Sequence, residues 1–220
     1  MVNKINAKML FTEFLKYIPK IVNQQLPGLS AHIKMAPASR IPTLDPEYYK
    51  NNNPKPSAVM MLFYPKNEMA YLILTKRNAY NGVHSSQISF PGGKAEQEDK
   101  DLEVTALRET FEEIGVKSED IDVIKPFTQI YIPASNFLVS PFLGVSMTPP
   151  VFNASAYEVV ELVELSLDVF LDDSTVIVTD IETSYSQNVS FPAFKVGEHI
   201  VWGATAMILS ELKETIKSVL

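Results

Sequence analysis

Cysteine is absent from this chain of 220 residues, and tryptophan and histidine are scarce, with one and three copies. Without cysteine the chain has no disulfide, no thiolate zinc site and no cysteine nucleophile. Its apolar runs fall short of the roughly 20 residues that cross a bilayer. The apolar N-terminal segment is interrupted by charges and lacks a small-residue cleavage site after it. These absences predict a cytoplasmic protein that does not bind membranes.

Positive charge is also in short supply, since 19 lysines and arginines face 26 acidic residues and give a net charge of −7. General binding to nucleic-acid backbones requires clustered cations, so nucleic acid is not expected as a partner. An anionic small molecule would have to meet a local patch of positive charge. The candidates for that patch are Arg40, Lys76, Arg77 and Lys94.

The acidic residues are concentrated in one short segment. Residues 106–116 read ALRETFEEIGV, which places Glu109, Glu112 and Glu113 at the helical spacings i, i+3 and i+4. Side chains at these spacings project from one face of a helix. We therefore predict a helix over about 101–114 that packs through an opposite, apolar face. That face is expected to comprise Val104, Leu107, Phe111 and Ile114.

A glycine pair precedes this helix and points to a cation site. Residues 90–94 read FPGGK, and glycine lets the backbone turn sharply beside the acids. Magnesium prefers oxygen ligands, takes one or two carboxylates and fills its other positions with water and phosphate oxygens. The alternative is a solvated acidic helix face without a ligand. We favour a site for Mg²⁺ or Mn²⁺.

Together these segments resemble the Nudix box, which reads G, five residues, E, seven residues, then REUXEEXGU, where U is aliphatic. Residues 108–116 match the second half, except that Thr110 replaces an aliphatic residue. The first half departs, because Asp99 stands at the glutamate position counted from the second glycine. Counted backward from Arg108, that position holds Lys100. The resemblance implies that this acid supports the junction of loop and helix.

Sequence outside the box is similar to the coenzyme A pyrophosphatase branch of the Nudix hydrolases. Residues 74–77 read LTKR and residues 84–93 read HSSQISFPGG, where Ser86 replaces the usual glycine of a substrate loop. Four later segments resemble the same branch in the same order, at 136–142, 157–161, 166–167 and 201–206. The resemblance implies that coenzyme A or acyl-coenzyme A is split into 3′,5′-ADP and 4′-phosphopantetheine.

The resemblance also implies roles for the residues of the box. The metal ligands are expected to be Glu112, Glu113 and the carbonyl oxygen of Gly92. Glu109 either adds a ligand or takes a proton from the attacking water. Arg108 is expected to orient the carboxylates one and four residues further along the helix.

Further site residues are expected on both sides of the box. A later acid that serves as the base would be Glu158 or Glu161, and both can also be plain exposed acids. Trp202 is expected in the core rather than under an adenine ring. Substrate binding is expected from Arg77, His84, Gln87 and Lys94.

Two alternatives to the coenzyme A hypothesis stay open. One is a Nudix pyrophosphatase for another nucleoside diphosphate derivative, such as ADP-ribose or NADH. The other is a Nudix fold retained as a ligand-binding module with weak catalysis, which only the changes at Asp99 and Lys100 suggest.

The chain is expected to form a single Nudix domain over 1–220, with the box at 93–116. Its expected fold is α+β, an α/β/α sandwich with a mixed sheet between helices. Residues 1–56 are expected to hold an amphipathic helix, which packs on the domain or on a second subunit in a homodimer, and a proline-rich connector without chemistry. Strands are expected at 57–64, 69–75, 122–132 and 136–147, edge strands at 176–178 and 191–196, a helix or strand at 156–164, and a closing helix at 202–219.

Overall fold

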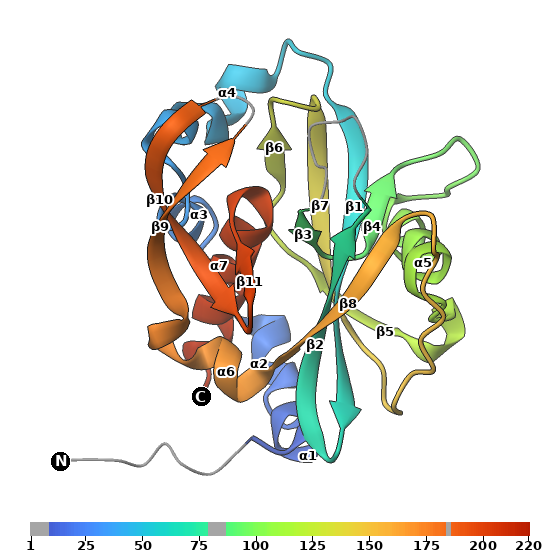
Figure 1. Cartoon of the computed structure of the whole chain (residues 1–220). Helices are drawn as coiled ribbons and strands as arrows, with labels where there is room; N and C mark the ends of the chain where they lie inside the picture. The colour runs from blue at the N-terminus through green and yellow to red at the C-terminus, as the bar shows by residue number, and fades with distance from the viewer. Residues whose placement is uncertain (1–8, 79–86, 184–185) are drawn as a thin grey trace, which may run out of the picture.

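The computed structural model describes residues 9–78, 87–183 and 186–220 (Figure 1). Within them, the central sheet is mixed and has eight strands. Strand β1 (Lys55–Lys66) lies between β2 (Met69–Arg77), which is antiparallel to it, and β7 (Phe137–Val145), which is parallel. The other strands of this sheet are β3 (Ile88–Ser89), β4 (Gly92–Lys94), β5 (Asp122–Pro126), β6 (Ile130–Ile132) and β8 (Val159–Ser166).

Helices cover both faces of this sheet, as the alternation of side chains along β1 requires. Met60 and Leu62 pack in the cluster that includes the helix α5 (Leu102–Ile114), whereas Met61 and Phe63 pack in the cluster that includes α7 (Gly203–Lys217). A strand buried on both faces reads as a continuous apolar run, as β1 does. The predicted α+β sandwich with a mixed sheet is therefore confirmed.

Helix α5 packs through a different face from the one expected. It begins after Asp101, whose side chain accepts a hydrogen bond from the Val104 amide at 3.0 Å, and it ends at Gly115 in a left-handed conformation. The predicted apolar face is partly wrong. Ile114 is fully buried and Leu107 packs against the core, but Val104 and Phe111 are 37% and 52% exposed. The small side chains on the buried face let the helix approach β1 and β4 closely. That face comprises Thr105, Ala106, Thr110, Glu113 and Ile114.

The C-terminal strands do not extend the main sheet, contrary to the expectation of edge strands. Strands β9 (Val176–Thr183), β10 (Ser186–Val196) and β11 (His199–Val201) pair with one another in a second sheet. The short helices α6 (Leu167–Leu171) and η3 (Asp173–Thr175) link it to β8. In Figure 1 this sheet lies beside α7, on the opposite side of the central sheet from α5.

The N-terminal segment forms short helices in place of the expected single helix. These are α1 (Phe11–Leu15), α2 (Ile18–Asn23), α3 (Leu29–Ile33), η1 (Ala38–Leu44) and α4 (Pro46–Tyr49). The helical pattern breaks before Pro19, which lacks an amide hydrogen and fits the first turn of α2. The connector is thus partly helical.

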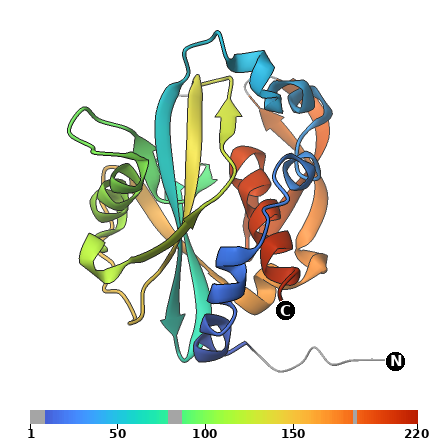
Figure 2. The same cartoon turned by 180° about the vertical axis from the view of Figure 1, so that it is seen from behind.

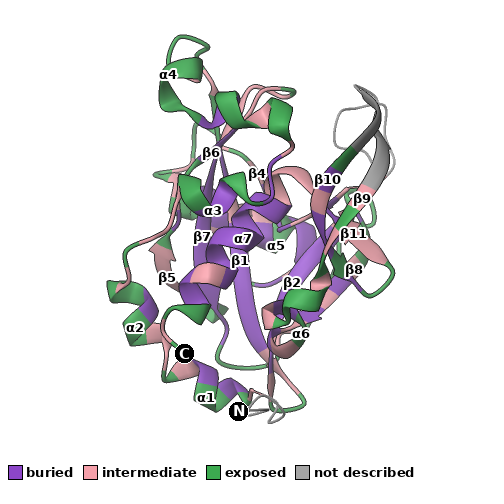
Figure 3. Cartoon of the chain, turned by 90° about the vertical axis from the view of Figure 1, so that its left-hand side faces the viewer, coloured by how far each residue is buried: buried purple, intermediate pink, exposed green. Residues whose placement is uncertain are grey.

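The apolar side of the N-terminal segment packs on the rest of the same chain. This is one of the two arrangements expected from the sequence, the other being contact with a second subunit. The rings of Phe14 and Phe63 lie 4.7 Å apart, and Ile21 is fully buried. Figure 2 shows α2 and α3 beside α7 and α1 near the turn between β1 and β2, and Figure 3 shows that the burial is densest where α7 meets the central sheet. No helix among the described residues has the length and apolar character needed to span a membrane.

Candidate active site

A cavity of about 660 Å³ lies where β1, β4 and β7 meet the N-terminal end of α7. One part of its wall is charged and the other is largely apolar. The charged part carries Arg77, Lys94, Glu109, Glu113 and Glu158. The apolar part includes Ile132, Pro133, Phe137, Val139, Phe191, Trp202, Ala204 and Ile208.

Glu113 is the most deeply buried acid of the cavity, with 1% of its surface exposed. Its carboxylate accepts hydrogen bonds from Arg77 Nη1 at 3.0 Å and from the Gly92 amide at 3.3 Å. Burial raises the pKa of Glu113 to about 7, although Arg77 and the Gly92 amide act against this rise. The nearby Glu109 and Glu158 raise it further. The site therefore favours a cation that would neutralise this carboxylate.

Glu109 lies one turn before Glu113 and faces the same cavity. Burial raises its pKa, while the hydrogen bond from Arg108 opposes the rise. The carboxylate occupies the space beside Gly93, since a Cβ atom at that glycine would lie 2.4 Å from Glu109 Oε2. The second glycine of the pair therefore makes room for an acid of the site.

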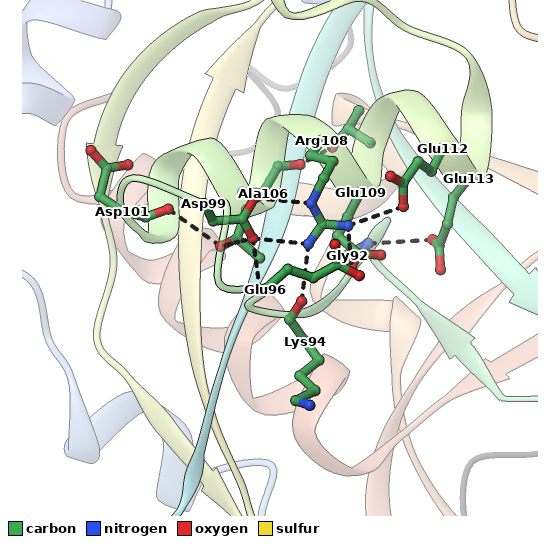
Figure 4. Close-up of polar contacts among 12 residues, drawn as sticks. Gly92, Lys94, Glu96, Asp99, Asp101, Ala106, Arg108, Glu109, Glu112 and Glu113 are labelled. Carbon is green, nitrogen blue, oxygen red and sulfur yellow. Dashed lines mark hydrogen bonds and ion pairs between the residues drawn. The ribbon is translucent and has the colours of Figure 1, made fainter.

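Arg108 connects the acids of the box, as Figure 4 shows. Its Nη1 donates to Glu109 Oε1 and Glu112 Oε2, each at 3.0 Å, which are the two contacts expected from the sequence. Its Nε and Nη2 bind both oxygens of Asp99 at 3.0 Å, and Nη2 also donates to the Lys94 carbonyl.

Asp99 holds the loop before α5 in place. It accepts hydrogen bonds from Arg108, from the Glu96 amide at 2.9 Å and from Thr105 Oγ1 at 2.8 Å. The hydrogen bond from Arg108 holds the pKa of Asp99 far below its usual range. Lys100 is exposed. The aspartate thus makes the loop–helix contacts implied for the box glutamate, despite the altered spacing.

Two acids that the sequence suggested lie away from the cavity wall. Glu112 is half exposed and is turned toward Arg108, so it would have to leave Arg108 to bind a cation. Glu161 pairs with His199 at 3.1 Å and with Lys76 at 3.6 Å. Of the two candidates for a later base, only Glu158 lines the cavity.

Three of the four residues expected to bind substrate lie on the cavity wall. Arg77, Gln87 and Lys94 line the cavity, and Arg40 does so from the N-terminal segment. The remaining residue, His84, lies outside the described part of the chain, as does Ser86. Lys76 is not on the cavity wall, which removes it from the expected cationic patch.

The expectation of a core position for Trp202 is wrong. This side chain is partly exposed on the cavity wall, and its ring lies 5.4 Å from that of Phe191. Phe191 and Ser135 of the wall had not been singled out from the sequence. No local sequence motif in these segments indicates a ligand site. This part of the wall forms only where the second sheet and the β6–β7 loop pack against the central sheet.

The donor atoms of the charged wall suit a divalent cation. Among the described residues, no three acidic, histidine or cysteine side chains are already arranged to hold a metal. Two carboxylates nevertheless face the cavity from α5, at Glu109 and Glu113, and Mg²⁺ takes only one or two. Gly92 donates its amide to Glu113, so it lies beside these acids. The residues present fit Mg²⁺ or Mn²⁺.

We expect the metal-free protein to lose stability as the pH rises, because Glu113 ionises more readily in the unfolded chain. Below pH 4.5 both states are protonated; between about 4.5 and 7 only the unfolded state releases the proton. Above pH 8 the free energy of unfolding should be lower by up to about 3 kcal/mol. Urea unfolding in EDTA from pH 4.5 to 8.5 measures this, and a slope unchanged in Glu113→Gln would contradict it.

Comparison with known proteins identifies the family of this chain. The NUDIX domain pattern matches residues 54–165. "Uncharacterized Nudix hydrolase NudL" of Pectobacterium atrosepticum is 32% identical over 141 residues, which are 64% of this chain and 72% of that protein. "Mitochondrial coenzyme A diphosphatase NUDT8" of Homo sapiens is 31% identical over 157 residues, 70% and 66% of the two chains.

A further relative and a solved structure complete the comparison. "Nudix hydrolase 22, chloroplastic" of Arabidopsis thaliana is 33% identical over 162 residues, 71% of this chain, which spans only 53% of that relative's length. The crystal structure of the Nudix hydrolase RenU from M. Smegmatis has a TM-score of 0.52 at 14% identity, and covers 76% of this chain and 88% of its own. It shares the fold. The chain belongs to the Nudix family.

Proposed function

We propose that the protein is a metal-dependent pyrophosphohydrolase that cleaves coenzyme A or acyl-coenzyme A. Water adds to one phosphorus of the pyrophosphate and the P–O–P bridge breaks, which gives 3′,5′-ADP and 4′-phosphopantetheine. The observation that carries this proposal is that one cavity is lined both by charged side chains and by a larger set of apolar ones. Such a cavity suits a substrate in which a pyrophosphate joins a nucleotide to an uncharged arm.

The relatives support the substrate class. Human NUDT8 is named a coenzyme A diphosphatase, and it aligns with 70% of this chain. The names of other relatives place them in chloroplasts or mitochondria, so a cytoplasmic location stays a prediction. Nucleotide-derived small molecules are the partners that the family and the cavity both favour.

The residues of the charged wall would have different roles in such a reaction. Glu109 and Glu113 would hold Mg²⁺, with the Gly92 carbonyl and a reoriented Glu112 as further expected ligands. When bound, the metal neutralises phosphate charge and polarises the phosphoryl oxygens. Arg108 keeps Glu109 in place from outside the cavity.

The remaining groups bind the substrate or accept a proton. A cation bound to Glu113 would neutralise its carboxylate and release Arg77 from the ion pair. The forked donors of the Arg77 guanidinium could then bind phosphate oxygens. Lys94 offers a second cation, and Gln87 offers an amide on the same wall. The proton of the attacking water passes to Glu158, or to Glu109 if that side chain does not bind the metal; both face the cavity.

Product analysis tests the proposal. The purified protein is incubated with Mg²⁺ and, separately, with coenzyme A, ADP-ribose and NADH, and the products are separated by chromatography. The proposal requires that coenzyme A has the highest kcat/KM and releases 3′,5′-ADP. Preferred cleavage of ADP-ribose or NADH would overturn the substrate class, and binding without turnover would overturn the enzymatic function.

Gly93→Ala is expected to lower kcat by about 10²-fold with little loss of stability. The new Cβ would collide with the Glu109 carboxylate, the movable end of a side chain, and displace it. Gly92→Ala is the contrasting variant, since its Cβ would lie 2.3 Å from the Ala58 carbonyl oxygen at a backbone φ of +153°. It should mainly reduce the thermal midpoint. Kinetics and thermal unfolding of both variants check this, and a fully active Gly93→Ala enzyme would contradict it.

A further inference from the structure

Arg40 reaches the cavity from a part of the chain outside the matched domain at 54–165. It lies in η1, and Figures 1 and 2 place this blue segment and α5 on opposite sides of strands β1 and β7. The guanidinium donates to Thr43 Oγ1 and, at 2.8 Å, to the Tyr131 carbonyl of β6. These contacts fix the cation at the part of the wall away from the acids.

The charge of Arg40 has no acidic partner among the described residues. The two contacts are to neutral oxygens and use two of the five N–H donors of a guanidinium. Burial is the main cause that lowers the pKa of Arg40, which reflects the cost of keeping this cation away from water. Arg77, another arginine of the cavity wall, is paired with Glu113. A ligand anion would give Arg40 the acidic partner that it lacks among the described residues.

The neighbouring wall offers a second donor. The hydroxyl of Ser135, in the loop between β6 and β7, is buried and has no hydrogen-bond partner among the described residues. The same loop contributes the apolar Ile132 and Pro133 to the wall. A buried hydroxyl without a partner is costly unless a ligand satisfies it. An anion with several oxygens could accept from both Arg40 and Ser135.

We propose that Arg40 binds an anionic group of the substrate that is separate from the pyrophosphate, and that this group is a phosphate monoester on the ribose. Arg40 is then a specificity-determining residue. It favours coenzyme A, which carries a 3′-phosphate, over dephospho-coenzyme A, ADP-ribose and NADH, which carry no such group. This inference rests on the proposed function, because the pyrophosphate must occupy the acidic part of the cavity.

Kinetics with a matched pair of substrates test the role. We expect kcat/KM for coenzyme A to exceed that for dephospho-coenzyme A by about 10- to 100-fold, as one charge-assisted contact allows. Arg40→Gln should bring this ratio close to one, chiefly by lowering kcat/KM for coenzyme A. Arg40→Lys should retain part of the preference. Lys50→Gln removes a charge from the same N-terminal segment outside the cavity, and it should keep the full ratio.

A binding experiment separates this inference from the proposed function. Trp202 is the only tryptophan of the chain and lines the cavity, so its fluorescence reports binding there. We expect 3′,5′-ADP to bind more tightly than 5′-AMP to the unaltered protein, and equally weakly to Arg40→Gln. Cleavage of coenzyme A with a ratio unchanged by Arg40→Gln would overturn the inference alone. If coenzyme A is not cleaved, the proposed function fails, and the two nucleotides still decide whether Arg40 binds the extra phosphate.

Discussion

Glu113→Gln is expected to lower kcat by about 10³-fold or more while the protein stays folded. The amide is nearly isosteric and can still accept a hydrogen bond from the Gly92 amide. It carries no charge, so it would bind Mg²⁺ poorly and would no longer hold Arg77. A loss of several kcal/mol of transition-state stabilisation corresponds to this factor. Steady-state kinetics across Mg²⁺ concentrations, with calorimetry of Mg²⁺ binding, measure both effects.

Glu103→Gln is the matched control for this variant. Glu103 is an exposed acid in the first turn of the same helix and does not line the cavity. Its removal changes the net charge equally and should leave kcat and Mg²⁺ affinity unchanged. Equal losses in both variants would mean that general charge, rather than a specific ligand, accounts for the effect. Full activity of Glu113→Gln would exclude this carboxylate as a metal ligand.

The sequence pattern predicted the helix well but its packing face only in part, since Ile114 is buried and Phe111 is not. Periodicity assumes that apolar side chains mark the buried side. In α5 the buried side carries an acid, Glu113, because the helix lies against β4 at the wall of a cavity. Phe111 is consequently more than half exposed. A conflict between local pattern and packing is typical of functional sites.

The cavity's other walls depend on contacts between distant segments, which one sequence does not reveal. Arg40, Ser135 and Trp202 come from three separate regions and meet only because η1, the β6–β7 loop and the N-terminal end of α7 converge. Arg40 could be singled out by its charge alone. The short motif at 106–116 was predictable because its residues interact within one helix and with the loop just before it.

A buried acid outside the cavity gives the largest expected effect on stability. Glu211 of α7 is fully buried, and its carboxylate accepts from the amides of Gly28 and Thr128 at 3.1 and 3.2 Å. It also contacts His32 Nε2 at 3.3 Å and the Thr128 hydroxyl. Burial opposes its ionisation, but the hydrogen bonds from His32 and Thr128 outweigh burial and lower the pKa of Glu211. One carboxylate thus joins the N-terminal helices to α7 and to the loop before β6.

Glu211→Ala is expected to lower the free energy of unfolding by about 3–5 kcal/mol at pH 7, since several buried donors lose their acceptor. Thermal unfolding should show a midpoint lower by about 10 °C. Because the pKa is lowered in the folded state, the contribution of Glu211 exists above pH 4.5 and is lost as the pH falls through the folded pKa. Glu214→Ala, which removes a partly exposed partner of Lys34 on the same helix, should cost about 1 kcal/mol or less. Similar midpoints for the two variants would show that the N-terminal helices depend on their apolar contacts rather than on this buried acid.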